Sequence, residues 1–143
     1  MVIDQEIIDS RLEKIRANLV DLKTMAKLTA KDFLSDSIKI SAAERNLQIS
    51  IEAMLDIGNH IIAEKGFEQP TEYRDIFLVL GKRGVFSGSF TEKLVEMAGL
   101  RNRLVHVYMD IDPKQIYEFL TRDLGDFDAF VKQILIYCNK ESK

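Results

Sequence analysis

Apolar residues recur at intervals of three and four along almost the whole sequence, which is the spacing of amphipathic α-helices. Between Asp4, which can cap a helix start, and about Lys27, they fall at Ile7, Ile8, Leu12, Ile15, Leu19 and Leu22. No stretch shows the sustained alternation of a half-buried strand. Because each such helix must bury its apolar face against another element, the pattern predicts an all-α, antiparallel helical bundle.

The same periodicity predicts about five helices in one domain that covers residues 1–143. After the first, they are expected at about 30–63, with a kink or break near 35–41, at 71–80, from 89 or 91 to 109, and from 112 to about 139. Thr71 is expected to cap the third helix, whose apolar residues are Tyr73, Ile76, Phe77 and Leu80. Asp112 with Pro113 is expected to start the last helix. Gly125 is a possible weak point in that last helix.

Composition narrows the class of protein. The formal net charge of −3 and the pI of about 5.4 argue against indiscriminate nucleic-acid binding. A single cysteine, Cys138, cannot form an internal disulfide, and no cluster has metal-ligand spacing, so we expect neither metal nor cofactor. The N-terminus is acidic and no apolar run is long enough for a membrane span. These features predict a cytoplasmic protein without membrane contact.

Positive charge is concentrated in one segment of this acidic chain. Residues 81–108 contain five basic side chains and two acidic ones, namely Lys82, Arg83, Lys93, Arg101, Arg103, Glu92 and Glu96. A locally positive region could hold a polyanion, although a window of this kind is common in a chain with 30% charged residues.

The octapeptide RNRLVHVY, residues 101–108, lies within the fourth predicted helix. A helix advances about 100° per residue, so Asn102 and His106 share a ridge away from the apolar stripe, while Arg101 and His106 diverge by about 140°. Either the arginine side chain swings across, or a second copy of the helix supplies the missing partner. We favour a twofold homodimer in which two arginines and two histidines line one groove.

These residue types suit phosphodiester chemistry. Histidine can take a proton from a ribose 2′-hydroxyl or give one to a leaving oxygen, and arginine matches phosphate and stabilises growing negative charge. His106 and Arg101 could therefore cleave RNA without a metal, with Asn102 fixing the imidazole. A lone histidine on the polar ridge is poorly placed for a core role.

The octapeptide resembles the R-x-x-x-x-H-x-Y signature of the HepT-like branch of the HEPN superfamily, with Arg101, His106 and Tyr108 at its fixed places. AAERNLQISIEAMLDIGNHIIAEKG, PTEYRDIF and GLRNRLVHVY are similar to successive blocks of that family. The resemblance implies an all-α homodimer that acts as the ribonuclease toxin of a toxin–antitoxin pair. It also implies an MntA-like nucleotidyltransferase antitoxin that transfers AMP to Tyr108, where the adduct would occupy the phosphate site beside Arg101.

Two alternatives remain. The chain could be a non-catalytic subunit that binds nucleotide or substrate for a nucleotidyltransferase, or a structural dimerisation domain that tolerates alanine at Arg101 and His106. His60, Glu44 and Arg45 are expected to have structural roles.

Overall fold

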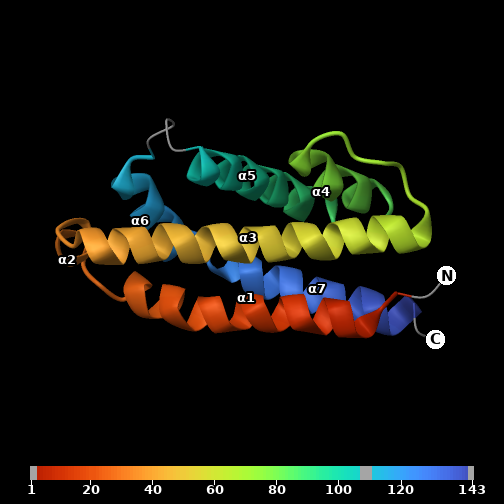
Figure 1. Ribbon diagram of the computed structural model, residues 1–143, viewed down its shortest axis with the longest axis horizontal. Helices are drawn as coiled ribbons and strands as arrows, with labels where there is room; N and C mark the ends of the chain where they lie inside the picture. The colour runs from red at the N-terminus through yellow and green to blue at the C-terminus, as the bar shows by residue number, and fades with distance from the viewer. Residues whose placement is uncertain (1–2, 107–110, 142–143) are drawn as a thin grey trace.

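The computed structural model confirms the all-α fold (Figure 1). It describes residues 3–106 and 111–141, and in these two ranges it contains helices and no strand. None of the described helices is both long and apolar enough to cross a membrane. The helices are α1 (Gln5–Ala26), α2 (Ala30–Leu34), α3 (Ser37–Lys65), α4 (Tyr73–Lys82), α5 (Gly88–Val105), α6 (Pro113–Arg122) and α7 (Gly125–Glu141).

Two of the predicted helices are divided. Asp36 separates α2 from α3. Its carboxylate caps α3 by accepting hydrogen bonds from the N–H groups of Ile38 and Lys39. This break lies where the sequence led us to expect one. The last predicted helix is interrupted at Asp123 and Leu124, and α7 begins at Gly125. The described part of the chain thus holds seven helices where about five were predicted.

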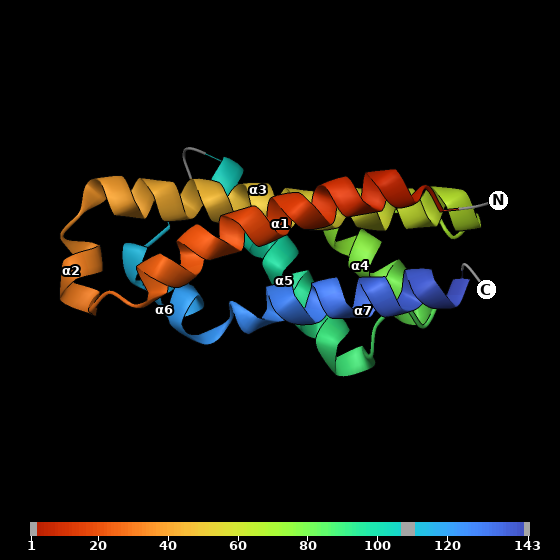
Figure 2. The ribbon, with the colours of Figure 1, turned by 90° about the horizontal axis from the view of Figure 1, so that it is seen from below.

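The long helix α3 is the centre of the bundle. It packs against α1 on one side and against α4 and α5 on the other, while α7 lies behind them (Figure 1). In the view from below, α1 and α7 run antiparallel and both chain ends lie at the same end of the molecule (Figure 2). Four phenylalanines are among the largest fully buried side chains: Phe33, Phe77, Phe127 and Phe130.

The predicted apolar faces are largely buried, with informative exceptions. Ile8, Leu12 and the later apolar positions of α1 form the core, whereas Ile7 is 39% exposed. Tyr73, expected on the apolar face of the third helix, is 44% exposed. An exposed tyrosine in the first turn of α4 contributes little to the hydrophobic core.

The start of α4 is fixed by hydrogen bonds to Asp75. Its carboxylate accepts from the Thr71 hydroxyl at 2.8 Å and from the backbone N–H of Glu72 at 3.0 Å. The helix cap is Glu72, one residue beyond the predicted Thr71. These contacts fix the start of α4 and therefore the position of Tyr73, its first residue.

Candidate functional site

The end of α5 differs from the prediction in a way that shapes the site. The helix was expected to reach Met109, but it ends at Val105, and His106 has extended backbone angles, φ −91° and ψ 102°. A helical wheel therefore does not apply to His106. Tyr108 lies outside the described residues.

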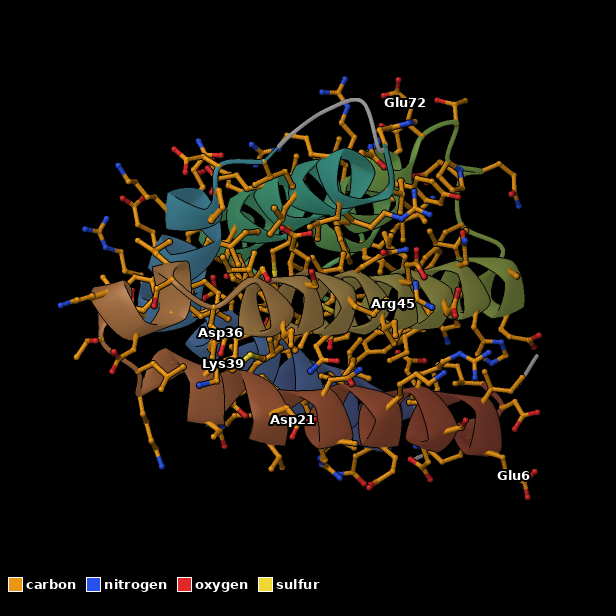
Figure 3. All side chains as sticks on the ribbon, turned by 60° about the vertical axis from the view of Figure 1, so that its left-hand side comes forward. Glu6, Asp21, Asp36, Lys39, Arg45 and Glu72 are labelled. Atoms are coloured by element: carbon orange, nitrogen blue, oxygen red, sulfur yellow. The ribbon has the colours of Figure 1, made fainter. Side chains whose placement is uncertain are left out.

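Arg101, Asn102 and His106 line one open pocket of about 940 Å³. Asn59 of α3 and Tyr73 and Arg74 at the start of α4 line it too, and we call it the Arg101 pocket. Glu72, also in its lining, lies at the outer edge of the molecule on the loop before α4 (Figure 3). Because the chain leaves the helix at His106, side chains that a wheel sets about 140° apart reach the same pocket in one chain.

Three side chains hold Arg101 in place. Its Nη2 atom lies 3.2 Å from Oε1 of Glu52, and its Nε atom donates to the same oxygen at 3.3 Å. Its Nη1 atom donates to Oδ1 of Asn102 at 3.2 Å. The guanidinium also lies over the Tyr73 ring, with Cζ 4.3 Å from the ring centroid. With 16% of its side chain exposed, Arg101 has a defined orientation but still reaches the pocket.

Two of these partners were not predicted as site residues. Glu52 lies on α3, where Gln48 also donates to its Oε1 atom at 3.2 Å. In the sequence it is a single acidic residue between buried Ile51 and Ala53, which is a weak signal. Tyr73 was expected among the apolar residues of its helix, and only its position directly after a polar helix cap could have suggested exposure.

The basic residues of 81–108 do not gather at the Arg101 pocket. Arg83 pairs with Glu68, and Lys93 lies 3.7 Å from the Asp126 carboxylate. The Arg103 Nη1 atom donates to Gln115 on α6 at 3.4 Å. Arg101 and Arg74 are the cationic residues that line the pocket among those described. Of the five basic residues of 81–108, Arg101 alone lines this pocket, and Arg74 comes from outside that segment.

Of the three residues expected to be structural, His60 has a contact that fits this interpretation. The Nε2 atom of His60 accepts a hydrogen bond from the backbone N–H of Asp4 at 3.0 Å, which ties the start of α1 to α3. Partial burial raises the pKa of Glu44. Arg45 is exposed on α3, away from the Arg101 pocket (Figure 3).

Comparison with solved structures defines the class of protein. A tri-AMPylated HEPN toxin from Shewanella oneidensis, solved in complex with an MNT antitoxin, matches with a TM-score of 0.84 and 26% identity. The match covers 91% of this chain and 97% of the toxin. This all-α bundle, with arginine, asparagine and histidine around one pocket, is a HEPN-type domain.

The family follows from the sequence. A family model described as "Ribonuclease HepT-like" matches residues 11–134, and the chain belongs to this family. A tRNA nuclease HepT from Aphanizomenon flos-aquae is 35% identical over 136 residues, which are 94% of this chain and 92% of the relative. An mRNA nuclease HepT from Shewanella oneidensis is 32% identical over 105 residues, 73% and 75% of the two chains. The resemblance seen in the octapeptide and its neighbouring blocks is confirmed.

Proposed function

We propose that this protein, acting as one domain over residues 1–143, is a cytoplasmic endoribonuclease toxin that cleaves RNA without a metal ion. The observation that carries the proposal is that Arg101, Asn102 and His106 line the same open pocket. Membership of the ribonuclease HepT-like family supports it. The two HepT relatives are named as nucleases of tRNA and of mRNA, which supports RNA as the substrate class.

In the proposed reaction the ribose 2′-oxygen attacks the adjacent phosphorus, and the bond from phosphorus to the 5′-oxygen breaks. Arg101 binds the phosphate and stabilises the negative charge that grows in the transition state. His106 either takes the proton of the 2′-hydroxyl or protonates the leaving 5′-oxygen, and solvent water makes the other proton transfer. Asn102 orients Arg101 through its hydrogen bond and supports the imidazole. The products are a 2′,3′-cyclic phosphate and a 5′-hydroxyl.

Replacing His106 by alanine tests this proposal. Because general acid–base catalysis contributes about 10²–10⁴-fold, we expect cleavage by His106→Ala in EDTA to fall by that factor while circular dichroism is unchanged. An RNA with sulfur in place of the leaving 5′-oxygen identifies the step, since a thiolate leaves without a proton. Rescue of His106→Ala by this RNA assigns the histidine as the acid, and lack of rescue assigns it as the base.

The proposal would be contradicted if purified wild-type protein that carries no adenylate cleaves no RNA. It would favour the second class of function, a non-catalytic partner subunit of a nucleotidyltransferase. If His106→Ala cleaves RNA at the wild-type rate, only the proposed role of this histidine would be contradicted.

The proposed regulation is transfer of AMP to Tyr108 by an MntA-like nucleotidyltransferase. Its support is the solved relative, a tri-AMPylated toxin in complex with an MNT antitoxin. Coexpression with the cognate transferase should add one or more adenylate masses to the protein, and Tyr108→Phe should not gain them. The proposed homodimer is tested by light scattering of the wild-type protein.

A further inference from the structure

Tyr73 is an aromatic side chain that stays partly exposed even though the Arg101 guanidinium packs over its ring. It keeps 44% of its surface exposed, and its hydroxyl makes no hydrogen bond within the described part of the chain. Tyr117 is a useful contrast, because it is half-buried and its hydroxyl donates to the Leu28 carbonyl at 2.6 Å. Exposing a large aromatic ring forgoes the stabilisation that its burial would give.

The ring lies where a ligand of the Arg101 pocket would meet it. Tyr73 lines that pocket, and it also lines a smaller hollow of about 260 Å³ together with Glu52, Asn59 and Arg101. The stacked pair of Tyr73 and Arg101 therefore lines both hollows. The larger one also contains Asn102 and His106.

We propose that Tyr73 is a stacking platform for the nucleobase next to the phosphate that Arg101 binds. This inference rests on the proposed ribonuclease function. Single-stranded RNA exposes its bases, and proteins bind them by stacking on aromatic rings next to cationic groups that hold the backbone. The side chains of Asn59 and Glu72 line the same pocket and can bond to the edges of the stacked base.

A role limited to holding Arg101 in place is the competing explanation, because the guanidinium lies 4.3 Å from the ring centroid. The two roles differ in what they demand of the substrate. A platform acts through the base, so an RNA that lacks that base gains nothing from the ring. A residue that only positions Arg101 acts equally on an RNA with or without the base.

The test is a cycle of two changes, Tyr73→Leu in the protein and an abasic nucleotide on either side of the cleaved bond in the RNA. For the wild-type enzyme we expect an abasic site to raise KM about tenfold, whereas for Tyr73→Leu the intact and abasic RNAs should have similar KM. Tyr73→Phe should behave as the wild type. Equal penalties for the abasic site in wild type and Tyr73→Leu would overturn the inference.

Leu78→Ala is the matched control. Leu78 lies on the same helix, is 46% exposed and is absent from the lining of both hollows, so its KM should equal that of the wild type.

A binding measurement separates failure of this inference from failure of the proposed function. His106→Ala is mixed with an RNA that carries 2-aminopurine at the sensitive position, whose fluorescence falls when the base stacks. We expect quenching that is lost in the double variant with Tyr73→Leu. Quenching that persists in the double variant, or never occurs, overturns the platform even if the wild type cleaves RNA. If the wild type cleaves no RNA, that result contradicts the proposed ribonuclease function. The stacking role of Tyr73 is then decided by the fluorescence measurement.

Discussion

Gly58 of α3 lies directly against Ile76 of α4: a Cβ atom built on Gly58 would overlap the Cγ2 atom of Ile76 and lie 3.2 Å from Leu80. The absence of a side chain at this position lets the two helices approach closely. This approach brings Tyr73, at the start of α4, to the arginine that Glu52 of α3 holds.

Gly58→Ala should therefore destabilise the protein. Overpacking costs about 1–3 kcal/mol in the free energy of unfolding, which urea denaturation measures. Gly99→Ala is the control, because Gly99 lies on α5 with no atom within 4 Å of the added Cβ. That change should stabilise the protein by about 0.5–1 kcal/mol, since glycine is costly inside a helix. Equal stability of the two variants would contradict the close packing of α3 and α4.

Glu52→Gln should slow RNA cleavage through kcat. A hydrogen bond to a charged group contributes about 1.5–3 kcal/mol, so a less well-held Arg101 should lower kcat by about tenfold or more. KM should not rise, because removal of a carboxylate leaves the pocket more positive. The pH and salt concentration are kept fixed.

Asp56→Asn is the control for that variant. Asp56 lies one turn along α3 and borders the smaller hollow, but its carboxylate pairs with Nε of Arg11 at 3.0 Å and not with Arg101. Its kcat should match that of the wild type. If both variants lose activity equally, the effect comes from the charge of the surface and not from the pairing with Arg101.

Ser50→Ala should stabilise the protein. Ser50 is fully buried on α3, and its hydroxyl has no hydrogen-bond partner within residues 3–106 and 111–141. Leaving such a group unsatisfied costs about 1–3 kcal/mol, so its removal should raise the free energy of unfolding by about 1 kcal/mol or more. Ser41→Ala, at an exposed position of the same helix, controls for helix propensity. A loss of stability in Ser50→Ala would show that the hydroxyl is bonded.

Asp75 should make stability fall in acid. The hydrogen bond from Thr71, followed by that from the backbone of Glu72, holds the pKa of the Asp75 carboxyl below its usual value. The stabilisation is complete above the unfolded-state pKa, which is about 3.9, and is lost as pH falls through the lower folded-state pKa. Urea denaturation from pH 6 to 2 should show the wild type more stable than Asp75→Asn, with a difference that shrinks as pH falls. If the difference in unfolding free energy between the two proteins does not change with pH, the ionised Asp75 carboxylate does not stabilise the start of α4.

The helices could be predicted from the sequence because apolar spacing is a local property. The exit of the chain from α5 at His106 could not, since no glycine or proline in residues 101–108 marks a helix end. The pairing of Arg101 with Glu52 joins residues 49 apart. Such a contact depends on how α3 and α5 pack, which the pattern within either helix does not encode.

Both ends of the chain are attached to the last part of α3, through Asp4 on His60 and through Glu141 on Lys65, and they lie at the same end of the molecule (Figure 2). A force applied between the two termini would therefore peel α1 and α7 apart turn by turn. It would not slide them past one another, so the bundle should open at low mechanical load from that end.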